Sequence, residues 1–395
     1  MRRVAFCWEA GGGHGHLFRM LLLAAELKKR DIEPVFIIKE IRSAAERLIK
    51  NGYRVVQAPL LSRRTATRPA AVVNNFADIL LGQGFSSVNE LSGLLKAWHD
   101  TIELIAPDLI ITDFAPTALL ASKEMGIPQI IYGDPFGAPP AQTPFPSLRP
   151  WSRISVAQLK RSNAIALKNA NESLSQLGRA PLTCLTEIHA AERNYLCCFD
   201  ELDPYGKRSD GNYVGNLFDA TQGARPIWPE GDGQKLFLYL PSHHPLLKSL
   251  MTAISRLPIR CLAYIPGTPK EIDIATNIKV SAQPLSIAQL MREADCFACG
   301  GHGTVSASLM AGKPVLLLPA QLEQRILATR VEAMQCGFHI PPHSPPQEIG
   351  KRLTTLLTTA TVRENSLRFA QRHTGFNQQT QIKKIADELL LTIEQ

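Results

Sequence analysis

The stretch ADCFACGGHGTVSASLMAGKPVLLLPAQLEQ, residues 294–324, decides the fold class. Its apolar start predicts a buried strand up to Cys299, its glycines predict a tight turn, and a helix is expected to begin near Thr304. A second apolar run, KPVLLLPA, predicts the next strand. Backbone N–H groups and the positive end of the helix dipole then face whatever lies at the end of the first strand, and a diphosphate fits there. On these residues alone, the alternative is a plain strand–helix turn whose glycines serve packing.

The same alternation of strands and helices extends along the whole chain. Strands are expected at 2–8, 33–40, 53–59, 107–114 and 127–134, and again at 235–242, 258–267, 277–283, 294–301 and 313–320. Helical patterns between them predict parallel sheets with crossover helices. The segment 213–234 is rich in glycine, proline and acidic residues, which is typical of a linker. We therefore expect an α/β protein with two Rossmann-like domains, 1–215 and 216–375. A C-terminal amphipathic helix, 376–395, follows, and the N-terminal domain is one candidate for its packing partner.

Composition excludes several classes of protein. A chain of 395 residues is too long for one ordinary core, and 45% hydrophobic residues indicate a globular protein. The eight cysteines are scattered along the chain and predict no disulfide framework, which favours reduced thiols in the cytoplasm. Glu9 interrupts the first apolar run too early for a signal peptide, and no run approaches the roughly 18 apolar residues of a membrane span. The net charge of +8 is spread over both halves, so we expect no nucleic-acid partner.

Residues 283–337 resemble the donor-binding signature of the GT-B glycosyltransferases, most closely the nucleotide-sugar-dependent family that includes bacterial antibiotic and sterol glycosyltransferases. The resemblance is carried by Pro284, Leu285, Asp295, Gly300, Gly301, Gly303, Thr304, Gly312, Pro314, Pro319 and Gln324. It implies a GT-B fold, with two Rossmann-like domains facing across a cleft and the donor on the C-terminal domain. Gly303 and Thr304 would hold the diphosphate, Glu323 and Gln324 would take sugar hydroxyls, and the segment from Leu285 would flank the base, usually uracil.

Two departures from the family pattern leave the identity of the nucleotide open. Cys299 stands where the family has a histidine beside the diphosphate, and His302 is either its substitute or a solvent-facing residue. In LYLPSHH, residues 238–244, Ser242 matches a phosphate-contacting serine of the family. Pro241 replaces a glycine there, which removes one backbone donor from the turn.

The first glycine turn, AGGGHGHLF at residues 10–18, is similar to that of the peptidoglycan lipid-linked N-acetylglucosaminyltransferase and to the GHxxP motif of nucleotide-sugar glycosyltransferases. Both alignments place the functional histidine at His16 and not at His14, with Arg19 at the usual proline position. Glycine allows a ligand to approach the backbone closely. The turn residues in question are Gly11, Gly12, Gly13 and Gly15.

The resemblance gives His16 the role of general base, because glycosyl transfer requires an acceptor hydroxyl to lose its proton. Asp113 ends the strand PDLIITDF and matches the DxF strand end that carries the partner aspartate in plant members of the family. Asp108 is the competing carboxylate, but it begins that strand at the opposite edge of the sheet. The residues alone also allow both histidines to be turn residues and Asp113 to be a helix cap.

We therefore expect an inverting glycosyltransferase that uses a nucleotide sugar and needs no metal or other cofactor. The resemblance implies that the sugar is linked to UDP. No DxD-like motif stands at a strand end. A nicotinamide dehydrogenase is disfavoured because GxGxxG is not satisfied in the first turn. A sugar-nucleotide epimerase of the same fold and a non-catalytic sugar-nucleotide-binding protein remain as alternatives.

Two basic segments concern the acceptor, which the sequence does not identify. Residues 42–68 carry seven Lys and Arg residues against Glu46, and residues 149–168 carry five and no acid. One interpretation is a solvated helix face with its loop. The other is a surface that attracts an anionic or lipid-linked acceptor, with peripheral association at the inner face of the membrane.

Overall fold

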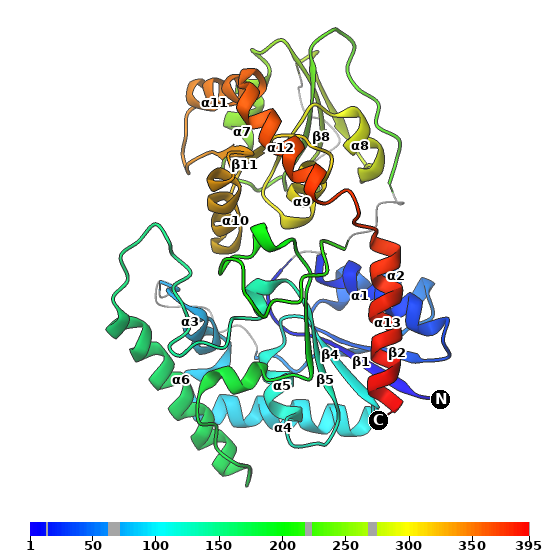
Figure 1. Cartoon of the computed structure of the whole chain (residues 1–395), viewed down its shortest axis with the longest axis vertical. Helices are drawn as coiled ribbons and strands as arrows, with labels where there is room; N and C mark the ends of the chain where they lie inside the picture. The colour runs from blue at the N-terminus through cyan, green and yellow to red at the C-terminus, as the bar shows by residue number, and fades with distance from the viewer. Residues whose placement is uncertain (13–14, 62–71, 218–222, 268–274, 395) are drawn as a thin grey trace. The chain divides into compact units, whose positions relative to one another are not determined.

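The computed structural model describes residues 1–12, 15–61, 72–217, 223–267 and 275–394. The chain divides into two compact units: unit 1 comprises Met1–Leu217 with Asn377–Gln395, and unit 2 comprises Phe218–Phe376. Each unit contains a six-stranded parallel sheet with helices connecting the strands (Figure 1). The predicted α/β fold with two Rossmann-like halves is confirmed. The chain passes from one unit to the other after Leu217, where the sequence suggested a boundary after residue 215.

The sheet of unit 1 has the strand order β3-β2-β1-β4-β5-β6. Its strands are β1 Arg3–Trp8, β2 Glu33–Ile38, β3 Arg54–Gln57, β4 Leu109–Thr112, β5 Gln129–Gly133 and β6 Arg193–Leu196. Strands β4 and β5 are buried throughout, as continuous apolar runs predict for strands covered on both faces. The strand order reverses between β1 and β4, and open sheets of this kind bind ligands outside the carboxyl ends of the strands at such a point.

The main helices of unit 1 are α1 Gly15–Lys28, α2 Ile41–Lys50, α3 Phe76–Leu80, α4 Val88–Ile105, α5 Pro116–Ser122, α6 Val156–Gln176 and α13 Gln378–Glu394. The N-terminus of α4 is capped by Ser87, whose hydroxyl accepts the N–H of Glu90. Helix α13 lies beside α1 (Figure 1), and Nη2 of Arg30 is 2.7 Å from Oδ1 of Asp387. Helix α4 and strand β6 were not among the elements expected from the sequence.

The sheet of unit 2 has the order β12-β11-β10-β7-β8-β9, which repeats the arrangement of unit 1. Its strands are β7 Gln234–Tyr239, β8 Ile259–Tyr264, β9 Ile278–Ser281, β10 Cys296–Cys299, β11 Val315–Leu317 and β12 Gly337–His339. Its helices are α7 Leu247–Ile254, α8 Ile287–Glu293, α9 His302–Met310, α10 Leu322–Ala333, α11 Pro346–Thr358 and α12 Ala360–Arg372. Strand β12 was not expected. Helix α9 begins at His302, so Gly303 and Thr304 lie within its first turn.

Candidate active site

The side chains of His16 and Asp113 meet at the carboxyl edge of the unit 1 sheet. His16 lies in the first turn of α1, which follows β1, and Asp113 directly follows β4. The two strands are neighbours, and the N–H of Asp113 donates to the carbonyl of Cys7 at 3.0 Å. Nδ1 of His16 lies 3.0 Å from Oδ1 of Asp113, whose side chain has no exposed surface. The competing Asp108 accepts the N–H of Arg3 at the opposite end of the sheet.

The imidazole of His16 is held between an aromatic ring and a glycine. It stacks on the indole of Trp8, with ring centroids 5.1 Å apart and an interplanar angle of 20°. The indole N–H of Trp8 donates to the carbonyl of Ala10 at 2.6 Å, which fixes the indole against the turn. A Cβ placed on Gly11 would lie 2.7 Å from Nε2 of His16, and Gly11 has a φ of +76°. The turn therefore needs a glycine at this position both for its backbone conformation and for the space that the imidazole occupies.

Asp113 also depends on a glycine. A Cβ on Gly133, the last residue of β5, would collide with the carboxylate of Asp113. The neighbouring strand therefore leaves space for this carboxylate at the edge of the sheet.

Arg19 is the second cationic side chain on Asp113. Its Nε lies 2.8 Å from Oδ2 of Asp113, and its side chain is 9% exposed. Burial is the largest single influence and opposes its positive charge, but Asp113, together with smaller contributions from Cys197, Asp134 and Tyr132, outweighs burial and raises the pKa of Arg19. Arg19 is three residues after His16 on α1, so both side chains lie on one face of the helix. Arg19 was expected only to replace the usual proline, and its contact with Asp113 was not predicted, although its spacing from His16 is visible in the sequence.

The contact with Asp113 assigns the tautomer of His16. A carboxylate oxygen attracts a hydrogen and repels a lone pair, so its approach to 3.0 Å favours the tautomer of the neutral imidazole with the hydrogen on Nδ1. Nε2 then has a free lone pair on the side of the ring that is turned away from Asp113. A histidine in this tautomer can take a proton at Nε2, and a carboxylate beside Nδ1 stabilises the imidazolium that results.

Two more charged residues surround the first glycine turn. Glu9 follows β1, and its Oε1 accepts the N–H of Thr117 at the start of α5 at 2.7 Å. Burial raises the pKa of Glu9 to about 7, although that hydrogen bond and the charge of Lys39 work against the shift. Nζ of Lys39, after β2, donates to the carbonyl of Gly11 at 2.7 Å. Sequence analysis gave neither residue a role in the site.

The remaining residues of the first turn are less informative. Gly12 is exposed, and a Cβ there would meet no other atom within 4 Å. Gly15 is the first residue of α1. Gly13 and His14 lie outside the described residues.

In unit 2, the second glycine turn connects β10 to α9. Gly301 is the N-cap of α9, and His302, Gly303 and Thr304 form its first turn, where the positive end of the helix dipole lies. A Cβ on Gly300 would lie 2.8 Å from the carbonyl oxygen of Leu318 and 3.0 Å from Oε1 of Gln324.

The two sugar-binding candidates lie in the first turn of α10, which follows the loop after β11. Glu323 lies in the first turn of α10. Gln324 is the next residue, and its Oε1 accepts the N–H of Ala320 at 2.8 Å. The structure therefore brings Gln324 beside the glycine turn, with its side-chain oxygen used within the loop.

The loop after β7 is held by two neighbouring segments. The exposed Ser242 donates its N–H to the carbonyl of Pro266 at 3.1 Å, so its hydroxyl is the group that remains for a ligand. Nδ1 of the buried His244 accepts the N–H of Leu246, so its Nε2 carries the hydrogen that points at the carbonyl of Leu318, 3.1 Å away. This second contact ties the loop to the end of β11.

Cys299 and Leu285 are held by burial and by backbone pairing, respectively. Cys299 ends β10 and is completely buried, and burial raises the pKa of its thiol. Cys299 is therefore neutral and turned into the core. Leu285 forms an isolated parallel bridge with Ala224, which holds the segment before α8 against the start of unit 2.

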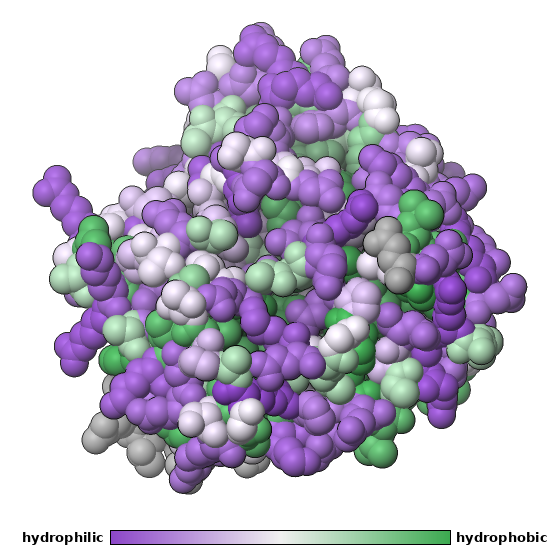
Figure 2. All heavy atoms as spheres, turned by 60° about the horizontal axis from the view of Figure 1, so that its bottom comes forward, coloured by the Kyte–Doolittle hydropathy of each residue, from purple (hydrophilic) through white to green (hydrophobic). Residues whose placement is uncertain are grey.

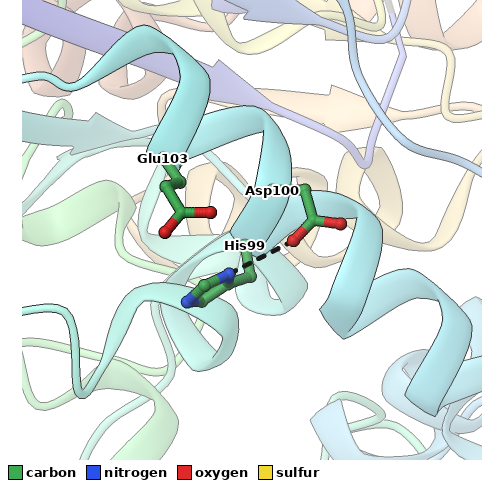
Figure 3. A group of neighbouring side chains, drawn as sticks. All are labelled: His99, Asp100 and Glu103. Atoms are coloured by element: carbon green, nitrogen blue, oxygen red, sulfur yellow. Dashed lines mark hydrogen bonds and ion pairs between the residues drawn. The ribbon is translucent and has the colours of Figure 1, made fainter.

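Within unit 1, one group of described residues has the composition of a metal site. His99, Asp100 and Glu103 project from α4 with their ligand atoms within 4.8 Å of one another (Figure 3). Nζ of Lys96 lies 2.5 Å from Oδ2 and 2.6 Å from Oδ1 of Asp100, so a cation already neutralises this carboxylate. The group lies on a partly exposed helix face, and we assign it no metal.

The chain is similar to known glycosyltransferases in both sequence and structure. No family model matches the chain. It is 23% identical over 314 residues to the PGL/p-HBAD biosynthesis rhamnosyltransferase of Mycobacterium bovis BCG, and the match covers 72% of this chain and 67% of the relative. Among solved structures, it superposes on the calicheamicin glycosyltransferase CalG4 with a TM-score of 0.74 and 19% identity, over 100% and 98% of the two chains. It also superposes on the spinosyn rhamnosyltransferase SpnG complexed with thymidine diphosphate, with a TM-score of 0.70 and 16% identity over the whole of both chains.

The solved structures define the class of fold: the chain has the GT-B architecture of two parallel α/β domains. The curated relatives define the class of enzyme, since they carry the names rhamnosyltransferase and glycosyltransferase. The chain is a glycosyltransferase of the hexosyltransferase type, as the resemblance in the sequence predicted.

Proposed function

We propose that this enzyme transfers a sugar from a nucleoside-diphosphate sugar to an acceptor hydroxyl with inversion of the anomeric carbon, and that His16 is its general base. Nε2 of His16 takes the proton of the acceptor hydroxyl while the oxygen attacks the anomeric carbon. The bond between that carbon and the diphosphate oxygen breaks, and the nucleoside diphosphate leaves. The observation that carries the proposal is the 3.0 Å contact between His16 and a fully buried Asp113. A base held in this way contributes about 10²–10⁴ in rate.

We assign the donor to unit 2. The first turn of α9 supplies backbone N–H groups and a positive dipole end to a leaving diphosphate, and Thr304 supplies a hydroxyl there. Stabilisation of this kind needs no metal, so we propose a metal-independent reaction. The base is proposed as uracil, and thymine is the competitor because two structural neighbours were solved with thymidine diphosphate.

The test has a binding arm and a turnover arm. Calorimetry on the full chain with UDP, TDP, ADP and GDP identifies the base, and wild-type affinity for a purine diphosphate above that for both pyrimidines contradicts the assignment. Incubation of the donor sugar with a panel of acceptors, followed by NMR of the product's anomeric proton, reports transfer and stereochemistry. A retained configuration contradicts the inverting mechanism. Donor binding with neither transfer nor donor hydrolysis supports the non-catalytic binding protein, and isomerisation of the donor sugar supports the epimerase.

For the acceptor, we propose an anionic molecule or an anionic lipid surface, on the evidence of α6. This helix exposes Lys160 and Arg161, and it also exposes the apolar side chains of Val156 and Ile165. Lys168 on the same helix instead lies 3.7 Å from Glu172. In the other basic segment, residues 42–68, one cation already has an acidic partner, because Arg54 pairs with Glu33. Arg63, Arg64 and Arg68 lie outside the described residues.

None of the helices in the described part of the chain has the length and apolar character to cross a membrane. Hydrophilic residues dominate the face drawn in Figure 2, and its hydrophobic residues lie in small separate patches. We propose that association with a lipid surface depends mainly on charge, with each Lys or Arg near the surface contributing about 1 kcal/mol.

A further inference from the structure

Asp113 is shared by two side chains of one helix, and this arrangement has a consequence for His16. Oδ1 lies 3.0 Å from Nδ1 of His16, and Oδ2 lies 2.8 Å from Nε of Arg19. The Asp113 side chain has no exposed surface, and the side chains of His16 and Arg19 are each 9% exposed. Water therefore screens these charges poorly, and each charge acts strongly on the others.

From this geometry we infer that Arg19 is a positioning residue for the proposed base: it holds Asp113 by its second oxygen, and its fixed charge keeps the imidazole of His16 neutral and ready to accept a proton. This inference rests on the proposed function. It goes beyond the pairing of a histidine with an aspartate, because it gives a defined role to the residue that stands in place of the usual proline.

The positioning effect follows from the two-point contact. A carboxylate held only by His16 could rotate about its Cβ–Cγ bond or move with the imidazole. With Oδ2 fixed by Arg19, Oδ1 stays directed at Nδ1, which fixes both the ring and its tautomer. Arg19 is itself anchored, because the hydroxyl of Tyr132 donates to its carbonyl oxygen at 3.2 Å.

The effect on proton affinity follows from the sum of charges. With neutral imidazole, the charges of Asp113 and Arg19 cancel. When His16 takes a proton, the three groups carry a net charge of +1 in a buried setting. Without Arg19, protonation of His16 would form a neutral pair of Asp113 and His16, which costs less free energy in a buried setting. A neutral side chain in place of Arg19 should therefore make protonation of His16 less costly.

The other titratable groups near this cluster do not cancel the effect of Arg19. On the end of β2, Lys39 adds positive charge beside Gly11. Beyond the end of β5, Asp134 opposes it and acts on Arg19, and Glu9 on the end of β1 has a pKa raised by burial to about 7. Burial raises the pKa of Tyr132 and of Cys197, after β6, well above their usual values, so both are neutral.

The experiment measures the titration of His16 directly, in the absence of substrate. Arg19→Met and Arg19→Gln remove the charge at similar side-chain length, and Arg19→Lys keeps the charge but loses the planar Nε donor. The imidazole signals are followed by NMR against pH, and the His16 signal is assigned as the one missing from His16→Gln. We expect the midpoint to move to higher pH by roughly 1–2 pH units in the Met and Gln variants and by much less in the Lys variant.

The outcomes are separable from the proposed function. If either neutral variant folds and its His16 titrates as in the wild type, the inference is wrong, and so it is if Arg19→Lys moves the midpoint as far as the neutral variants do. The acidic limb of the kcat/KM profile against pH is the second readout. If the NMR midpoint moves and the acidic limb does not follow, Arg19 acts on His16 as inferred, but His16 is not the base, and the proposed function fails instead.

Discussion

Gly11 and His16 occupy adjoining space at the end of β1, and a Cβ on Gly11 would lie 2.7 Å from Nε2 of His16. This relationship explains why the first turn combines glycine with histidine. The nitrogen in contact range of Gly11 is the one that the Asp113 contact leaves free to take a proton. A side chain at position 11 would displace the imidazole, and the positive φ of Gly11 adds backbone strain to any such replacement.

Gly11→Ala is therefore expected to lower kcat/KM by at least about tenfold while the protein stays folded. The matched control is Gly12→Ala in the same turn, where a Cβ meets no other atom within 4 Å. Steady-state kinetics with the donor sugar measures both variants. Equal activities for the two would show that the space beside His16 is not required.

The pair of His16 and Asp113 predicts a second set of variants. His16→Ala and Asp113→Asn should lower transfer by roughly 10²–10⁴, because one removes the base and the other removes the charge that orients it. Nucleotide affinity should stay within a few-fold, since the donor is assigned to the other unit. Asp108→Asn at the opposite end of β4 is the control, and His14→Ala should be milder than His16→Ala. An inactive His14→Ala with an active His16→Ala would mean that the wrong histidine was assigned.

Thr304 in the first turn of α9 tests the donor site. Thr304→Val removes a hydroxyl from the proposed diphosphate site at nearly constant volume, so the dissociation constant for the preferred nucleoside diphosphate should rise by roughly tenfold. Thr354→Val on an exposed position of α11 is the matched control in the same unit. Calorimetry on the full-length variants measures both affinities. If Thr304→Val binds as tightly as Thr354→Val, the hydroxyl of Thr304 does not contact the diphosphate.

Glu9 predicts a pH-dependent change in stability. Burial raises its pKa in the folded state to about 7 from an ordinary value of 4.5, so the folded state binds this proton more tightly than the unfolded state does. That contribution to stability is fully present below pH 4.5 and is lost as the pH rises through about 7. The glutamine of Glu9→Gln cannot ionise. The unfolding free energy of this variant minus that of the wild type should therefore be larger at pH 8 than at pH 4.5, by up to roughly 3 kcal/mol.

Denaturant unfolding of Glu9→Gln and wild type from pH 4.5 to pH 8 measures that difference. Glu46→Gln, at an exposed position of α2, controls for the loss of one charge. A stability difference for Glu9→Gln that does not change with pH would show that Glu9 has the same proton affinity in the folded and unfolded states.

The exposed cations of α6 predict salt-dependent binding to lipid. The double variant Lys160→Gln/Arg161→Gln should lose most of its binding to vesicles that contain anionic lipid at low salt, because attraction at an exposed surface is screened within about 10 Å. Lys351→Gln/Lys383→Gln makes the same change in net charge at two exposed positions elsewhere and should keep its binding. No binding of the wild type at low salt removes the lipid surface as a partner. A KM for the acceptor that does not change with salt argues against an anionic acceptor as well.

Much of the fold could be predicted because it depends on local patterns. Continuous apolar runs such as residues 109–112 favour strands buried on both faces, and their alternation with helical patterns favours a parallel sheet. The strands β6 and β12 were missed for a physical reason. They are short edge strands, and half or more of their residues are not fully buried, so they lack the apolar run that marks the others.

The site was predictable to the extent that it depends on the edges of the sheet. The sequence by itself determined that His16 and Asp113 follow parallel strands and so lie at the same edge of the sheet. It also determined that the turn before His16 is rich in glycine. Only the tertiary structure decided that β1 and β4 are neighbours, which brings the two side chains to 3.0 Å. It also decided that Arg19 turns inward to Asp113 and that Glu9 is buried with its pKa raised. Burial and charge pairing of this kind depend on which segments pack together across the fold, and no local pattern in the sequence records that.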